Sequence, residues 1–229
     1  SSLAVLEAGS IATGRSQPLL PFQILKDPPS IYINWEIKAD MRQELINLIN
    51  YPTWLEMAPI TILEGEAEPR FYLTLNVYAV NGLSGFLAGL RAEWSIYVRK
   101  ADEPVSYMVV EARHTERSLD SVNGFVGGTD IQHEITGGDA ISTMIEFGNN
   151  ASFQSVIGGL ESADKATRVL PAREWVAAND RIYWRNGVAD RTYHDGDFSN
   201  NPVLSVDLSQ VAVEDGTVFA PFIDAQNPV

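Results

Sequence analysis

The stretch LRAEWSIYVRKADEPVSYMVVEAR, Leu90–Arg113, decides the fold class that the sequence predicts. Apolar and polar residues alternate on both sides of Ala101–Pro104, whose composition is typical of a turn. The pattern predicts two antiparallel strands joined as a hairpin. If Val98 and Val105 flank the turn, residues whose numbers sum to about 204 lie opposite each other.

This register predicts a charged face on the hairpin. Glu93 faces Glu111 and Arg91 faces Arg113, so all four side chains point to the same side, provided that no β-bulge intervenes. One interpretation makes this face the solvent side of a sheet. The other places it inside a barrel, where charges are costly unless they are paired and therefore mark a functional site. The alternation alone leaves both interpretations open.

Strand patterns extend outward from the hairpin in both directions. Arg70–Val80 alternates strictly and places Tyr72, Asn76 and Tyr78 on one side. The hairpin register also sets Tyr97 opposite Tyr107. Further strands are predicted at Ser30–Lys38, Ile141–Phe147, Ala151–Ile157, Ala166–Leu170, Arg181–Arg185, Arg191–His194, Val203–Leu208 and Val218–Phe222.

One helix and about ten strands define the expected fold class. The helix begins at Asp40 and ends near Asn50, before Pro52. We expect a mainly β (α+β) fold, a single antiparallel β-barrel domain over residues 1–229 with a few flanking helices. Residues 1–29 form an irregular N-terminal extension. A barrel is favoured because ten strands in one domain otherwise leave costly sheet edges.

Composition excludes several classes of function. The chain has 229 residues, a net charge of −14 and no cysteine. An acidic chain is repelled by phosphate backbones and anionic lipids, so nucleic-acid and membrane partners are not expected. Without cysteine there is no disulfide, zinc–thiolate site or thiolate nucleophile. No secretory signal is recognisable in 1–21, so a cytoplasmic location is expected.

The order of the elements resembles the acetoacetate decarboxylase-like superfamily. The resemblance rests on the following segments: Ile33–Lys38, Asp40–Leu48, Pro59–Leu63, Tyr72–Tyr78, RAEWSIYV (Arg91–Val98), SYMVVEA (Ser106–Ala112) and, more loosely, Glu174–Tyr193. It implies a single domain on a cone-shaped antiparallel barrel, with the site inside it and the subunits forming a homo-oligomer. It also implies that Glu93 occupies the position of the family's barrel glutamate, with Arg91 beside it.

The family's lysine chemistry does not carry over. Its decarboxylases form a Schiff base on a lysine that apolar surroundings and an adjacent lysine keep neutral. That pair should lie in His114–Phe125, which reads HTERSLDSVNGF and contains no lysine. The chain has only four lysines, Lys26, Lys38, Lys100 and Lys165. We therefore expect a mechanism that does not depend on lysine.

The sequence thus predicts a lysine-independent, lyase-type enzyme acting on a small carbonyl- or carboxylate-bearing organic substrate, possibly aromatic. Elimination, retro-aldol cleavage, hydration and isomerisation all remain open, by acid–base catalysis. The expected catalytic residues are Glu93 for proton transfer, Arg91 as anion clamp and His114 as partner. The expected substrate-binding residues are Glu111, Arg113, Tyr78, Tyr97 and Arg117.

Other interpretations remain open at this point. His114 can equally be an ordinary half-exposed histidine, and Arg117 a solvated loop charge. Three alternative functions are a non-catalytic small-molecule-binding barrel, an acetoacetate-type decarboxylase using an unrecognised lysine, and a scaffold for protein contacts. The histidines lack metal-ligand spacing and no nucleotide-binding loop is present, so we expect neither a metal nor a cofactor.

Overall fold

A computed structural model describes the residues that carry the fold. It covers residues 22–25, 27–50, 53–82, 88–119, 125–148, 151–158, 172–178, 180–185, 188–194, 212–213, 218–224 and 228. These residues are mainly β with few helices, as the alternation predicted, and they form two sheets. The helical elements are η1 (Ala39–Met41), α2 (Arg42–Leu48), η2 (Arg117–Leu119), α3 (Arg173–Ala177) and η4 (Ala220–Phe222).

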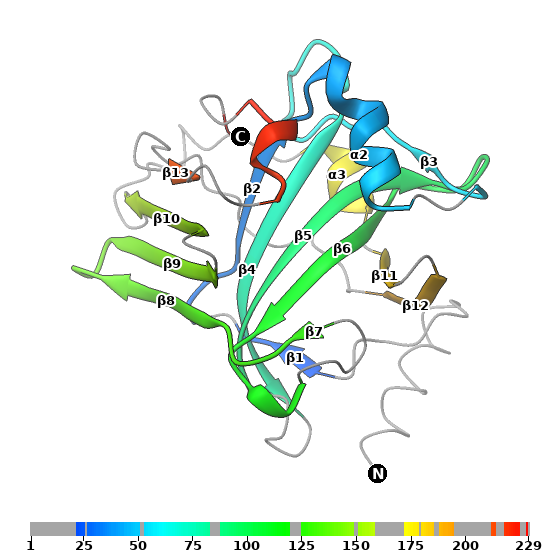
Figure 1. Cartoon of the computed structure of the whole chain (residues 1–229). Helices are drawn as coiled ribbons and strands as arrows, with labels where there is room; N and C mark the ends of the chain where they lie inside the picture. Colours follow the sequence, from blue (N-terminus) through cyan, green and yellow to red (C-terminus); the bar gives the residue numbers. More distant parts are fainter. Residues whose placement is uncertain are drawn as a thin grey trace, which may run out of the picture.

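The larger sheet has nine strands in the order β1-β4-β5-β6-β11-β12 (Figure 1). Three short strands extend it off this path, β2 along β4, β3 along β5 and β7 along β6. All pairings are antiparallel except β6 with β7 and β6 with β11. The strands are β1 (Phe22–Ile24), β2 (Ile31–Glu36), β3 (Glu56–Met57), β4 (Tyr72–Gly82), β5 (Gly89–Arg99), β6 (Ser106–His114), β7 (Phe125–Val126), β11 (Asp180–Arg185) and β12 (Val188–His194).

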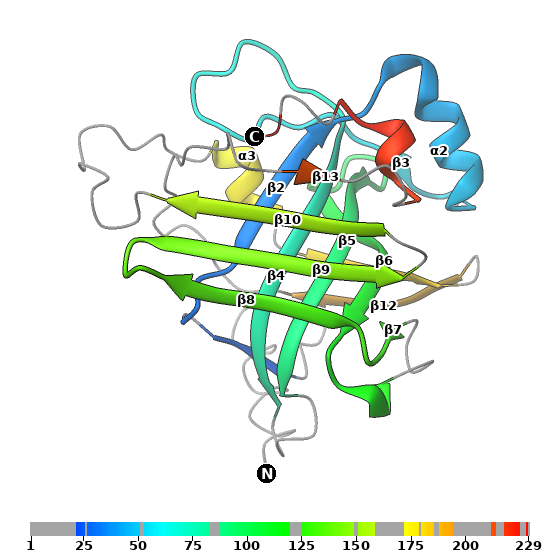
Figure 2. The ribbon, with the colours of Figure 1, turned by 60° about the vertical axis from the view of Figure 1, so that its left-hand side comes forward.

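The smaller sheet has four strands in the order β13-β10-β9-β8. Figure 2 shows β8, β9 and β10 lying across β4 and β5. Its strands are β8 (Asp130–Thr136), β9 (Ala140–Gly148), β10 (Ala151–Gly158) and β13 (Ala212–Val213).

The expected closed barrel is not found. Within the described residues the larger sheet ends at β1 and β12, which do not pair with each other. The second sheet packs against the apolar face instead, so two sheets share one core. Trp35 of β2 meets Phe153 of β10 edge-on at 6.2 Å between ring centres, and both side chains are fully buried.

One buried histidine connects the smaller sheet to the segment that precedes β2. The Nε2 of His133 on β8 lies 2.8 Å from the carbonyl oxygen of Pro29, which can only accept, so Nε2 carries the proton. In the neutral ring Nδ1 then accepts from the Thr143 hydroxyl, also at 2.8 Å. Burial lowers the pKa of His133 and so favours this neutral form, which the carbonyl of Pro29 partly opposes.

Several local predictions failed. Part of the stretch 1–29, which was expected to be irregular, forms strand β1, and two further failures have simple causes. Val218–Phe222 was predicted as a strand, but η4 begins at Ala220 with Pro221 in its first turn. Strand β8 was not predicted, because His133 occupies a buried position where the alternation requires an apolar residue. Ala166–Leu170 and Val203–Leu208 lie outside the described residues.

A β-bulge overturns the predicted register of the central hairpin. Tyr97 does face Tyr107, but the register shifts between Trp94 and Ser95, which pair with Glu111 and Val109. Val110 is thus the extra residue of β6. Beyond it every side chain of β6 lies on the face opposite to the one predicted.

The prediction that Glu93 faces Glu111 and Arg91 faces Arg113 is therefore wrong. Glu93 lies opposite Ala112, and Arg91 lies opposite His114. Glu111 and Arg113 point to the other side of the sheet, where they pair with each other.

Candidate functional site

Polar side chains line the face of the larger sheet that points away from the smaller sheet. On β4 they alternate with the core residues Leu73, Leu75 and Val77. The β4–β5 register places Asn76 opposite Glu93 and Tyr78 opposite Arg91, so these four share one face.

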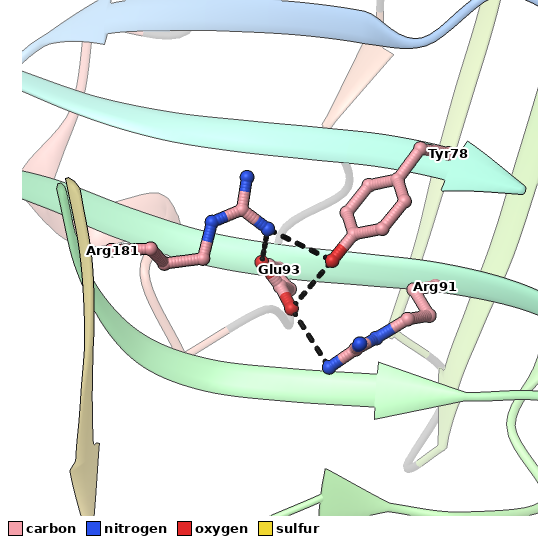
Figure 3. A network of polar contacts seen from close by, with 4 residues as sticks. All are labelled: Tyr78, Arg91, Glu93 and Arg181. Carbon is pink, nitrogen blue, oxygen red and sulfur yellow. Dashed lines mark hydrogen bonds and ion pairs between the residues drawn. The ribbon is translucent and has the colours of Figure 1, made fainter. Parts of the chain in front are cut away.

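Four of these polar side chains form one network, which we call the buried cluster: Tyr78, Arg91, Glu93 and Arg181 (Figure 3). Tyr78 donates from its hydroxyl to Glu93 Oε1 at 2.8 Å, and the Arg91 guanidinium lies 3.1 Å from the same oxygen. Arg181 donates to Glu93 Oε2 at 2.7 Å and to the Tyr78 oxygen at 2.9 Å. Both carboxylate oxygens of Glu93 are therefore held by cations.

The tyrosine ring also interacts with both arginines. The guanidinium carbons of Arg91 and Arg181 lie 5.7 Å and 5.4 Å from the centre of the Tyr78 ring. At these distances a guanidinium is attracted by the ring quadrupole. Tyr78 thus contacts both arginines through its ring, and Arg181 also through its hydroxyl.

The buried cluster lies out of water. The exposed fractions are 0% for Glu93 and Tyr78 and 2% for Arg91 and Arg181. The interpretation of Arg91 and Glu93 as a solvent face is therefore wrong. Two guanidiniums and one carboxylate give the four side chains a formal charge of +1. Burying charge is costly even when it is paired, so such a cluster contributes little to stability and marks a candidate site.

His114 is fully buried at the end of β6, so its interpretation as a half-exposed histidine is also wrong. Its Nδ1 accepts the backbone N–H of Glu116 at 2.7 Å, which leaves the proton of a neutral ring on Nε2. Gly89 makes room for the ring, because a Cβ there would lie 2.9 Å from His114 Cε1 and 2.5 Å from Thr115 Oγ1. Its φ of +147° also requires glycine.

A second, uncharged network continues along the same face. Asn34 Oδ1 accepts from Thr74 at 2.6 Å and from the Tyr97 hydroxyl at 3.0 Å. Trp175 of α3 donates to the Tyr97 oxygen at 2.8 Å. Burial raises the pKa of Tyr97 to about 12, so it stays a hydrogen-bond donor. Tyr97 therefore belongs to this network, and no described contact joins it to the buried cluster.

The remaining predicted site residues lie elsewhere. Glu111 and Arg113 form an ion pair of 2.7 Å whose side chains are 24% and 16% exposed, and Arg113 also donates to the Phe147 carbonyl at 3.2 Å. Arg117 is exposed on η2. Lys38 and Lys100 are exposed as well. Lys26 and Lys165 lie outside the described residues.

Sequence reasoning missed Arg181. It was placed in a strand, but β11 joins the sheet by parallel pairing with β6, in which Arg181 lies beside Tyr107. A parallel neighbour more than seventy positions along the chain leaves no local signal of its position. The sequence contains one weak indication that Arg181 lies on a polar side of its strand, because Arg181 and Tyr183 alternate with Ile182 and Trp184.

Four findings are negative. In the described part of the chain no group of three metal-ligating side chains lies close enough to hold a metal ion. None of the helices there is long and apolar enough to cross a membrane. No protein-family model matches the sequence, and no curated protein matches it significantly.

Proposed function

We propose that this protein is a lyase-type enzyme that binds a small organic anion at the buried cluster and acts on it by proton transfer, without a Schiff-base lysine. The observation that carries this proposal is the fully buried group of two guanidiniums, one carboxylate and one phenol, with a net charge of +1. The proposal retains the acetoacetate decarboxylase-like resemblance as the origin of this site.

Replacing a buried ion-pair network by apolar side chains of similar size is often neutral or stabilising. A sheet face that keeps such a network therefore has a use for it other than folding. Fixed guanidiniums in a dry site stabilise a carboxylate, and also the negative charge that develops on an enolate oxygen.

Each residue then has a role that follows from its contacts. Arg91 and Arg181 hold the anionic group of the substrate, and Tyr78 and Glu93 fix the two guanidiniums. Glu93 exchanges the proton, and His114, which lies opposite Arg91 on β6, supports the anion site. The two described lysines are exposed, which supports the lysine-independent mechanism over a decarboxylase of the acetoacetate type.

A non-catalytic binding protein is the second candidate, and one observation favours it. Glu93 is contacted by two cations and one hydroxyl, and opposite charges at this range stabilise the ionised carboxylate. A carboxylate held in this way is a weak base. The same cluster would then bind an anion without changing it.

Proton NMR in D2O separates the two candidates. Small oxo- and hydroxycarboxylates are incubated with the protein, and turnover or deuterium exchange at the carbon beside the carbonyl is followed. We expect exchange with the wild type, strong loss with Glu93→Gln and Tyr78→Phe, and no loss with Glu36→Gln, whose ion pair with Arg70 is exposed. Saturable binding without any exchange would establish the binding protein. Absence of binding by every anion would refute both functions.

A further inference from the structure

Asn76 lies at the centre of the polar face, beside the buried cluster. It is directly opposite Glu93 on β5 and opposite Tyr32 on β2. Its side chain is 3% exposed, and its buried Oδ1 accepts no hydrogen bond from the described residues. Buried acceptors in folded proteins are nearly always satisfied, so an exception indicates a partner from outside the chain.

The neighbouring amide shows that this face can satisfy such a group. Asn34 Oδ1 accepts two hydrogen bonds, from Thr74 and Tyr97. Asn34 and Asn76 lie on adjacent strands and share one face. Asn34 lies opposite Thr74, so it is the diagonal neighbour of Asn76. Of these two amides, it is the one that adjoins the charges whose acceptor is left open.

We propose that Asn76 Oδ1 accepts a hydrogen bond from a hydroxyl group of the ligand whose anionic group is held at Arg91 and Arg181. The ligand class is then a small hydroxycarboxylate, with the hydroxyl on a chain or on an aromatic ring. This inference rests on the proposed function, because it requires the anion site.

The geometry of the sheet limits the spacing within the ligand. Asn76 and Arg91 are diagonal cross-strand neighbours, whose separation is about 7–8 Å between backbones. The carboxylate group and the hydroxyl group must therefore be attached to different carbon atoms of the ligand skeleton. The net positive charge of the cluster disfavours an ammonium group as the donor, which leaves a neutral hydroxyl.

Matched ligands test this assignment. Binding is measured by titration calorimetry for 3-hydroxybutyrate, butyrate and 3-methoxybutyrate, and for 3-hydroxybenzoate, benzoate and 3-methoxybenzoate. We expect the wild type to prefer the hydroxyl compound in at least one set by about tenfold. The methoxy compound should bind no better than the unsubstituted one, because an ether oxygen cannot donate.

Variants assign the preference to Asn76. Asn76→Leu should fold, since it removes an unsatisfied buried acceptor, and should bind the three compounds of a set with equal affinity. Asn76→Ser keeps an oxygen acceptor and should retain part of the preference. Ser155→Ala is the control, because it removes another buried oxygen without a described partner from the smaller sheet, and it should leave the preference intact.

The possible outcomes distinguish the assignment of Asn76 from the proposed anion site. Equal wild-type affinity for the hydroxyl and unsubstituted compounds overturns this inference and assigns the Asn76 oxygen to water, while the anion site stands. If the wild type, Asn76→Ser and Asn76→Leu all prefer the hydroxyl compound to the same extent, the ligand hydroxyl binds elsewhere. That result also overturns this inference. Failure of every carboxylate to bind refutes the proposed function, and the inference with it.

Discussion

Glu93 and Glu111 each form an ion pair with an arginine, but the two pairs lie at different depths in the protein. We therefore expect the same substitution to have very different effects on stability at these two positions. Glu93→Gln and Glu111→Gln each remove one carboxylate from an ion pair whose shortest N···O distance is 2.7 Å. The side chains of Glu93 and Arg181 are at most 2% exposed, whereas those of Glu111 and Arg113 are 24% and 16% exposed.

The expected magnitudes follow from burial. Glu93→Gln leaves two buried guanidiniums without their carboxylate, and breaking a buried pair costs about 3–5 kcal/mol of unfolding free energy. For a chain of this size that corresponds to a fall in Tm of about 6–20 °C. Glu111→Gln breaks a partly solvated pair and should cost about 1 kcal/mol or less, a fall of at most about 4 °C.

Thermal unfolding followed by circular dichroism measures both effects, at 0.05 M and 1 M salt. The effect of Glu111→Gln should shrink at high salt because water reaches that pair, and that of Glu93→Gln should not. Equal Tm shifts for the two variants would refute the reasoning that burial and the bulge distinguish them.

A combined substitution completes this prediction. Replacing Arg91 and Arg181 by methionine and Glu93 by leucine removes every charge of the buried cluster at once. The triple variant should regain most of the Tm that Glu93→Gln loses, because no unpaired charge remains. It should bind no anion. A triple variant as unstable as Glu93→Gln would show that the cluster itself stabilises the fold.

Four further substitutions each test a single feature of the structure. Because burial lowers the pKa of His133, the unfolded chain binds its proton more readily, so the free energy of unfolding should fall as the pH drops below about 6.5. Urea titrations from pH 8 to 5 should show a smaller fall for His133→Gln, and an equal fall would contradict the neutral form. Gly89→Ala should cost about 1–3 kcal/mol and displace His114, seen as a changed imidazole NMR signal. Gly65→Ala, where a Cβ meets nothing within 4 Å, should cost backbone strain alone. Tyr97→Phe leaves buried partners unsatisfied and should cost about 1–3 kcal/mol in urea unfolding, and no change would show that water replaces the hydroxyl.

Local patterns predicted the elements of the fold, and the structure confirms them where alternation was regular. The strands β4, β5, β6, β9 and β10 and the helix that ends at Leu48 lie where the sequence placed them. These elements depend on residues a few positions apart, which the sequence displays directly. The closure of a sheet depends on which distant strands meet, and the expected barrel failed at that level.

The site was predicted only in part, for a specific physical reason. Glu93, Arg91 and Tyr78 come together because regular antiparallel pairing of β4 and β5 fixes their face. The partner strand was misplaced because Val109 and Val110 are both apolar, so the sequence does not show which of them is the extra residue. One extra residue exchanges the two faces of a strand completely.

The same bulge contributes to how Arg181 reaches the carboxylate. Glu93 pairs with Ala112 and Arg181 pairs with Tyr107, which lie five positions apart on β6, the strand between them. Because Val110 is an extra residue, these two positions correspond to Glu93 and Tyr97 on β5, four residues apart. In a flat sheet, with strands about 4.8 Å apart and about 3.3 Å per residue, the backbones of Glu93 and Arg181 would be on the order of 16 Å apart. An arginine and a glutamate cannot span that distance, yet their charged atoms meet at 2.7 Å. The sheet must therefore bend strongly toward its polar face, and a β-bulge in β6 both bends the strand and increases its twist. The irregularity that defeated the register prediction is thus part of what brings the second arginine to Glu93.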